Sequence, residues 1–291
     1  RGGRLVPVTG GWSEAPGVIY YDPHPTNCVS VNHCPAGSCR GYPRFTRVCG
    51  PEIGYHNLAV FYGACGLDCL FCQNWEHKEM SIRGRPSFSV EDLIAAAARR
   101  SVTCVCYFGG DPAPWSPHAI RASREILRRA EEGGRIMRIC WETNGIASAE
   151  VFREWVRLSA ESGGNVKVDF KAWTPSVYQA LTGVDARDHV IGNLRAAVDA
   201  HSERGDPPLL TVSVLLVPGY VDPEEVRMIA REVAQLDRTI PMVLLAFKPD
   251  HRLRDLPTTS RRHASEALRV VKEEGIKEVR LGNEWLLCDL Y

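Results

Sequence analysis

The chain has 291 residues, a formal net charge of zero and 24% charged residues, as an ordinary folded protein has. Balanced charge excludes a strong overall attraction to nucleic acid or to anionic membranes. No run of about 18 apolar residues occurs, so we expect no membrane contact through a transmembrane helix, and the opening RGGRLVPV shows no signal-peptide pattern. The length suits one large α/β domain or two smaller domains.

Cysteine is unusually frequent, with 11 residues, and most of them fall between positions 28 and 72. Secreted disulfide scaffolds are usually small and short of core, whereas this chain has many apolar segments. We therefore expect metal ligation in a reducing, cytoplasmic setting rather than disulfides. Cys104, Cys106, Cys140 and Cys288 lie elsewhere and are expected to be small buried core residues.

Residues 1–54 are rich in Gly, Pro, Asn and Cys without a sustained period, which predicts an irregular N-terminal extension before a main domain at 55–291. Cys28, Cys34, Cys39 and Cys49 lie in this extension with the spacing C-x5-C-x4-C-x9-C. Four thiols suffice for a second iron–sulfur cluster or for structural zinc, and free cysteines are the third alternative. His24 and His33 could substitute as ligands, but we expect both to be exposed loop residues.

From residue 57 onward, short apolar runs alternate with amphipathic helical patterns. Strands are predicted at 57–65, 102–112, 136–145, 165–173, 209–219, 241–249 and 277–283. Helices are predicted at 89–100, 117–132, 148–161, 175–181, 187–203, 222–236 and 259–274, with Ser89–Asp92 and Asp222–Glu225 as N-terminal capping pairs. This alternation predicts a parallel sheet with helical crossovers, either open or closed into a barrel.

The predicted strand at 165–173 carries charge on one face. Lys167, Asp169 and Lys171 alternate with apolar residues, so the three charges share one side of the strand. Buried charges are costly unless they are paired or used. The pattern therefore favours a polar, ligand-filled interior, and the alternative is an edge strand with a solvated face.

The stretch CGLDCLFC at 65–72 places Cys65, Cys69 and Cys72 in the spacing C-x3-C-x2-C. Iron–sulfur clusters usually take four thiolates. Three leave one iron open, just as catalytic zinc sites keep one open position. The motif therefore predicts an exogenous fourth ligand.

The same spacing, with Phe71 before the last cysteine, resembles the signature of the radical S-adenosylmethionine (radical SAM) superfamily. Three downstream segments continue the likeness. Gly109-Gly110-Asp111-Pro112 resembles the family's glycine-rich turn, with Asp in place of the usual Glu; Glu142-Thr143-Asn144-Gly145 and Asp169-Phe170-Lys171 resemble its polar strand ends. The resemblance spans about 55–283 and is nearest to the subgroup related to pyruvate formate-lyase activating enzyme. It implies a partial (β/α)6 barrel.

The resemblance implies that Cys65, Cys69 and Cys72 hold a catalytic [4Fe–4S] cluster whose open iron binds SAM. The reduced cluster would cleave SAM to a 5′-deoxyadenosyl radical, which abstracts hydrogen from a substrate, in this subgroup a glycyl or other protein residue. An electron donor such as ferredoxin or flavodoxin is implied as a partner. The implied SAM-contacting residues are Phe71, Gly109, Gly110, Asp111, Glu142, Asn144, Asp169 and Lys171.

Two other functions remain open from the sequence. Radical SAM modification of a small molecule or an RNA base is one, although the neutral net charge weighs against nucleic acid. A non-catalytic electron-transfer or zinc-binding protein is the other. It would leave the glycine-rich turn and the charged strand face without a purpose.

Overall fold

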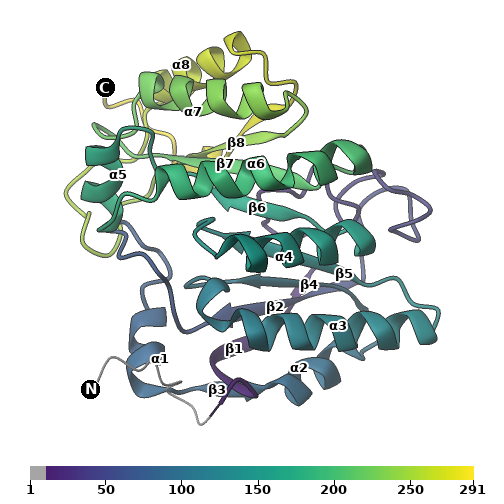
Figure 1. Cartoon of the computed structure of the whole chain (residues 1–291). Helices are drawn as coiled ribbons and strands as arrows, with labels where there is room; N and C mark the ends of the chain where they lie inside the picture. The colour runs from purple at the N-terminus through teal and green to yellow at the C-terminus, as the bar shows by residue number, and fades with distance from the viewer. Residues whose placement is uncertain (1–10) are drawn as a thin grey trace.

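In the computed structural model, which describes residues 11–291, nine strands form one sheet in the order β3-β1-β2-β4-β5-β6-β7-β8-β9 (Figure 1). The strands are β1 (Glu14–Pro23), β2 (His56–Tyr62), β3 (Ser87–Ser89), β4 (Val102–Phe108), β5 (Arg138–Thr143), β6 (Val166–Asp169), β7 (Leu210–Leu216), β8 (Met242–Ala246) and β9 (Val279–Gly282). Neighbours from β2 to β9 are parallel, while β1 pairs antiparallel with both β2 and β3. The sheet is therefore mostly parallel, and its two edges do not meet.

The crossover helices cover one face of this sheet and pack against one another in chain order (Figure 1). The helices are α1 (His77–Arg83), α2 (Val90–Ala97), α3 (Ser116–Glu132), α4 (Ala149–Ser162), α5 (Pro175–Thr182), α6 (Arg187–Arg204), α7 (Pro223–Leu236) and α8 (Arg261–Glu273), with short 3₁₀ turns η1 (Ala113–Trp115) and η2 (Glu284–Leu286). This one-sided α/β layer arrangement is the predicted partial barrel. It leaves the other face of the sheet as the barrel interior.

Local sequence signals explain the helix starts. Ser89 and Asp92 form the predicted capping box at α2. Asp222 caps α7, but Glu225, the expected partner in the N-terminal capping pair, bonds to a different loop. Its carboxylate accepts hydrogen bonds from the backbone N–H groups of Trp173 and Thr174, at 2.6 and 3.0 Å, and so fixes the loop after β6.

Residues 1–54 were expected to be irregular, and this is wrong for the segment that forms β1. Residues 1–10 of the predicted extension lie outside the described part of the chain. Pro16 and Gly17 break the strand pattern in the sequence. The strand forms because its partner β2, more than 30 residues later, offers a complete antiparallel ladder from Gly17–Tyr62 to Pro23–His56. The short elements α1 and β3 were also not predicted.

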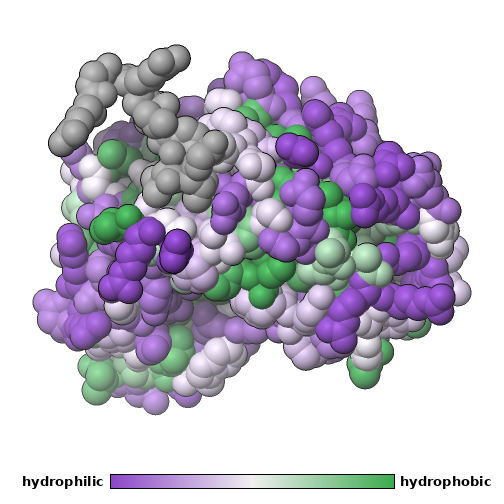
Figure 2. Space-filling model, turned by 90° about the horizontal axis from the view of Figure 1, so that it is seen from below, coloured by the Kyte–Doolittle hydropathy of each residue, from purple (hydrophilic) through white to green (hydrophobic). Residues whose placement is uncertain are grey.

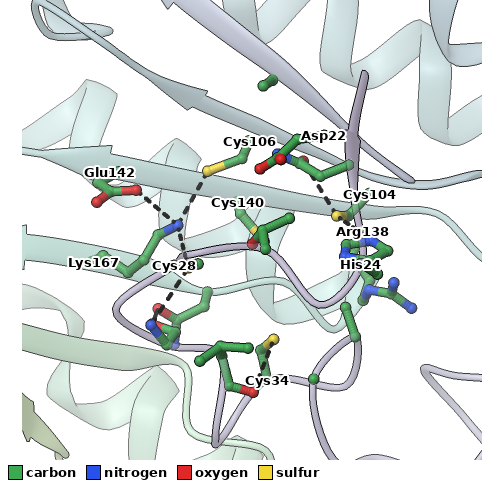
Figure 3. A pocket seen from close by; sticks show the side chains of 18 of the residues that line it. Asp22, His24, Cys28, Cys34, Cys104, Cys106, Arg138, Cys140, Glu142 and Lys167 are labelled. Atoms are coloured by element: carbon green, nitrogen blue, oxygen red, sulfur yellow. Dashed lines mark hydrogen bonds and ion pairs between the residues drawn. The ribbon is translucent and has the colours of Figure 1, made fainter. Parts of the chain in front are cut away.

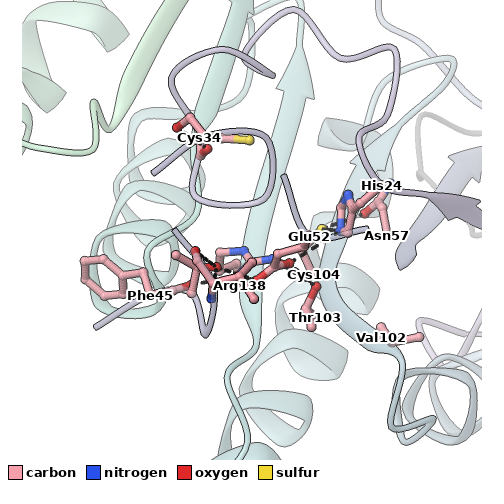
Figure 4. A network of polar contacts seen from close by, with 12 residues as sticks. His24, Cys34, Phe45, Glu52, Asn57, Val102, Thr103, Cys104 and Arg138 are labelled. Atoms are coloured by element: carbon pink, nitrogen blue, oxygen red, sulfur yellow. Dashed lines mark hydrogen bonds and ion pairs between the residues drawn. The ribbon is translucent and has the colours of Figure 1, made fainter. Parts of the chain in front are cut away.

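Residues 24–54 contain no helix or strand and pack against the interior face of the sheet. The Ser30 hydroxyl donates to the side chain of Asn165, at 2.9 Å, and lies 3.1 Å from the hydroxyl of Thr211. Further along, the carboxylate of Glu52 pairs with the guanidinium of Arg138 on β5 (Figure 4). The extension therefore forms the floor of the barrel, continuous with the main domain.

The β3 end of the sheet carries apolar surface. Figure 2 views this end and shows hydrophobic residues in the middle of the face with hydrophilic residues around them. Within residues 11–291, no helix combines the length and the hydrophobicity that a membrane span requires.

Candidate active site

All the residues predicted for the cluster and SAM lie around one cavity at the carboxyl ends of the parallel strands. This edge cavity has a volume of about 210 Å³. Its walls include Cys65, Phe71, Cys69, Cys72, Gly109, Gly110, Asp111, Glu142, Asn144, Asp169 and Lys171. In parallel α/β sheets, ligands bind at this edge because the loops from successive strands converge there.

The cysteine loop between β2 and α1 is held by its backbone. The N–H groups of Asp68 and Leu70 donate to the carbonyls of Thr182 and Leu181 at the end of α5, each at 2.9 Å. All three cysteines are free. Burial raises their pKa values, that of Cys65 to about 12 with a contribution from the charge of Asp111. Without metal they are neutral thiols, so binding iron must release protons.

The glycine-rich turn after β4 packs directly on the start of the cysteine loop. Gly109 and Gly110 have φ values of 69° and 33°, in the region that favours glycine. A Cβ on Gly110 would overlap the carbonyl oxygen of Ala64 and lie 2.7 Å from that of Tyr62. The next N–H, of Asp111, donates to Ala64 at 2.6 Å. The turn and the loop therefore position each other.

Replacing Gly110 with alanine is expected to lower SAM cleavage about 10²-fold, because the added Cβ displaces Ala64 and the adjoining Cys65. Anaerobic assay of 5′-deoxyadenosine formation measures the effect. Gly134→Ala is the matched control, since Gly134 also has positive φ, of 59°, but has no atom within 4 Å of the added Cβ. Equal activity of the two variants would contradict this role of the turn.

Asp111 joins two strand ends. One carboxylate oxygen accepts from the Thr143 hydroxyl and the Asn144 N–H, both at 2.8 Å, and the other accepts from the Ala113 N–H at 2.8 Å. The side chain is 1% exposed. Because the protein already uses both oxygens, we expect the backbone of the turn, rather than this carboxylate, to contact a ligand.

Lys171 and Asp169 form a buried pair in the wall of the edge cavity. The Lys171 ammonium lies 3.0 Å from one oxygen of Asp169, and the other oxygen accepts from the Ser213 hydroxyl. Burial is the largest single influence and by itself lowers the pKa of Lys171, but the charges of Asp169 and Cys69 and the hydrogen bond to Asp169 together outweigh it, so the net pKa is raised. The ammonium also lies 6.0 Å from the ring centroid of Phe71. Lys171 is therefore a fixed positive charge beside the cysteine loop.

The charged face predicted for the strand at 165–173 is inside the barrel. β6 lies between β5 and β7, so a solvated edge strand is excluded. Lys167 is 2% exposed, and its ammonium pairs with Glu142 at 3.2 Å. Glu142 borders both the edge cavity and a second, inner cavity deeper in the barrel.

The four cysteines of the N-terminal extension do not come together. Cys39 and Cys49 are joined by a disulfide, which the sequence did not lead us to expect. Cys28 and Cys34 are free and face the inner cavity. Because Cys39 and Cys49 bond to each other while Cys28 and Cys34 face the inner cavity, the expectation of one four-thiol site is corrected.

Other expectations for this region are also wrong. His24 and His33 are buried, at 6% and 3% exposure, rather than exposed. Cys104 and Cys106 are buried as expected, although they also line the inner cavity, whereas Cys140, which lines it too, and Cys288 are only half-buried. A signal for Cys140 was present, since it alternates in step with charged residues of the interior face, in Arg138-Cys140-Glu142.

A mostly parallel α/β barrel segment with three free cysteines beside a glycine-rich turn defines a class of enzyme that combines a cluster with SAM. A family model described as the radical SAM superfamily matches residues 59–233, more than half of the chain. The chain belongs to the radical SAM superfamily. Members use a [4Fe–4S] cluster and SAM, and they need a reductant.

Solved structures with a similar fold share little sequence with this chain. A domain of pyruvate-formate lyase-activating enzyme from Bacteroides vulgatus ATCC 8482 is 20% identical, with a TM-score of 0.47 over 62% of this chain and 98% of that one. The radical SAM methyltransferase TsrM from Kitasatospora setae is 19% identical, with a TM-score of 0.49 over 77% of this chain and 44% of that one. The protein anSMEcpe, solved with AdoMet and the Cp18Cys peptide, is 12% identical, with a TM-score of 0.50 over 75% of this chain and 60% of that one.

This chain thus spans less than two thirds of the length of the last two proteins. At these identities the similarity concerns the fold alone. No curated protein matches the sequence.

The residues at the edge cavity fit the cofactors that the family uses. Three free thiols line the cavity together with the glycine-rich turn. A Cβ on Gly110 of this turn would block the close approach of its backbone to Ala64. Among the described residues, no three His, Cys, Asp or Glu side chains converge as a single metal ion requires. An iron–sulfur cluster bears its irons at separate corners and spreads its thiolates more widely. The three free thiols provide the protein ligands that a cluster with one open iron needs.

Proposed function

We propose that this radical SAM enzyme acts on a protein or peptide, removing a hydrogen atom from a glycyl or other residue in the manner of an activating enzyme. The observation that carries the chemistry is the gathering of all the predicted cluster and SAM residues around one cavity. When bound, a reduced cluster and SAM supply a carbon-centred radical that removes hydrogen from a substrate C–H bond.

The side chains of the edge cavity have distinct parts in this proposal. Cys65, Cys69 and Cys72 would hold three irons and leave the fourth for SAM. The fixed charges of Lys171 and Asp169 would orient the polar groups of SAM, and the buried ring of Phe71 would cover one side.

The mouth of the edge cavity supports a macromolecular substrate. Gln73 and Asn74 line the cavity and are exposed. Asn283 also lines it, and Trp285, two residues further on, is 73% exposed. A large exposed aromatic ring beside a cavity mouth is a typical anchor for a protein partner.

A small-molecule substrate is the second candidate. The inner cavity, of about 220 Å³, meets the edge cavity at Phe108 and Glu142 and has room for a small ligand. The same radical chemistry would then act on a molecule that lies below SAM rather than on one that docks at the mouth.

Deuterium transfer distinguishes these substrates. The reconstituted enzyme is incubated anaerobically with dithionite, SAM and a host extract labelled with α-deuterated glycine. The extract is first separated into protein and small-molecule fractions. We expect deuterium in 5′-deoxyadenosine only with the protein fraction. Transfer only from the small-molecule fraction would overturn the proposed substrate, and no 5′-deoxyadenosine from iron-loaded enzyme would overturn the chemistry.

A further inference from the structure

The inner cavity is surrounded by sulfur. Five free cysteines from three parts of the chain line it (Figure 3). Cys28 and Cys34 come from the N-terminal extension, Cys104 and Cys106 from β4, and Cys140 from β5. None of them belongs to the cysteine loop, and the extension brings its two thiols to strands more than 60 residues away.

Four of these thiols have little else to bind. Cys104 is engaged by the side chains of Asn57 and His24, at 3.3 and 3.4 Å. Within the described residues, Cys140 makes no hydrogen bond. Cys34 contacts the Val31 carbonyl at 3.9 Å and the backbone N–H of Gly37, and Cys28 accepts from the Ser30 N–H at 3.4 Å. Cys34 lies within electrostatic range of Cys28 and Cys140, and so does Cys106. Cys28, Cys34, Cys106 and Cys140 thus form one group around the cavity.

A buried positive charge lies among these sulfurs. The Lys167 ammonium is 3.2 Å from the Sγ of Cys28 and 3.1 Å from the Sγ of Cys106, and Glu142 is its only carboxylate partner among the described residues (Figure 3). A neutral thiol is a weak acceptor and compensates a buried ammonium poorly. Sulfur bound to iron keeps negative charge and is a stronger acceptor for an ammonium. The lysine therefore suits a cavity that contains metal thiolates.

We propose that Cys28, Cys34, Cys106 and Cys140 bind a second iron–sulfur cluster inside the barrel, below the edge cavity. Four thiolates complete a closed cluster with no open iron. A single zinc ion fits less well, since no three ligands in the described part of the chain converge on one point. In the described part of the chain the three cysteines of the edge cavity likewise do not converge on one point, and the superfamily uses a [4Fe–4S] cluster.

Iron counting in a variant without the first site tests the proposal. Cys65→Ala/Cys69→Ala/Cys72→Ala protein is reconstituted anaerobically with iron and sulfide. We expect about four irons and four sulfides per chain to remain, with a dithionite-dependent cluster signal in electron paramagnetic resonance. Adding Cys28→Ser/Cys34→Ser should remove them. Adding Cys39→Ser/Cys49→Ser, the disulfide pair, should leave them in place.

The outcomes separate this site from its rivals. The proposal would be overturned if the triple variant bound no iron, or if its iron persisted after Cys28→Ser/Cys34→Ser was added. Binding of one zinc ion without sulfide would also overturn it. If that variant fails to fold, as judged by circular dichroism, Cys140→Ser and the iron count of the unmodified chain decide. About eight irons support two clusters, and about four overturn the second. SAM cleavage by the unmodified chain is measured separately, so failure here leaves the proposed function standing.

Discussion

Replacing Cys69 with alanine is expected to reduce SAM cleavage to background. Cys69 is the middle thiol of the cysteine loop and faces the edge cavity together with Cys65 and Cys72. Two thiolates cannot hold a cluster that needs three protein ligands and an open iron. Reconstituted protein should contain about four fewer irons than the unmodified chain and should form no 5′-deoxyadenosine with dithionite and SAM.

Cys288→Ala is the matched control for this substitution. Cys288 is also free, but it lies beside the start of α8, where its Sγ donates to the carbonyl of Thr258 at 3.2 Å, and it borders neither cavity. We expect its iron content and SAM cleavage to be normal. Full cleavage by the Cys69 variant would refute the ligand role of this residue.

Glu52→Gln is expected to destabilise the protein by about 3–5 kcal/mol, because it leaves the charge of Arg138 buried without a partner. Both side chains are at most 2% exposed. Glu52 also accepts hydrogen bonds from the hydroxyls of Thr46 and Thr103, at 2.8 and 2.6 Å (Figure 4). The network joins the N-terminal extension to β4 and β5, and urea unfolding measures its contribution.

Two companion variants show whether the loss comes from an unpaired buried charge. Glu52→Leu/Arg138→Met removes both charges and should recover much of the stability. Arg157→Gln breaks ion pairs with Glu154 and Glu161 on the surface of α4, where Arg157 and Glu161 are about half exposed, and should have little effect. An unfolding midpoint of Glu52→Gln equal to that of the unmodified chain would contradict the argument.

The stabilisation from Glu52 should depend on pH in a defined direction. Burial alone would raise its pKa, but the hydrogen bonds and charge of Arg138 outweigh burial and lower the pKa below its ordinary 4.5. A carboxyl group with a lowered pKa stabilises the fold above its unfolded pKa. The stability difference between the unmodified chain and Glu52→Gln should therefore shrink as the pH falls below about 4.5 and through the folded pKa.

The main domain could be predicted because its signals are local. Most strands and helices after residue 56 bury an apolar face, although α1 buries only His77, and a residue such as Ser89 marks a helix start by its own hydrogen bonds. The edge cavity followed from the same logic, since motif residues at the ends of parallel strands must meet. No such periodicity marks β1, which forms only because β2 is there to pair with it.

The inner cavity could not be predicted because no local pattern says where an irregular segment packs. Cys28 and Lys167 are 139 positions apart and meet only once the extension enters the barrel. Alternation on β4 and β5 placed Cys106 and Cys140 on the interior face. Nothing in the sequence indicated that the opposing surface would be the extension itself.

The packing of the N-terminal extension as the floor of the barrel also constrains the order in which parts of the protein fold. Ser30 is synthesised early, yet its partners Asn165 and Thr211 follow 135 and 181 positions later. Closing such long loops is entropically slow, so the floor should dock late in folding. Until it docks, the inner face of the sheet is open to the surrounding solution. If the proposed second cluster forms, iron and sulfide would reach the cysteines of β4 and β5 most easily in that interval.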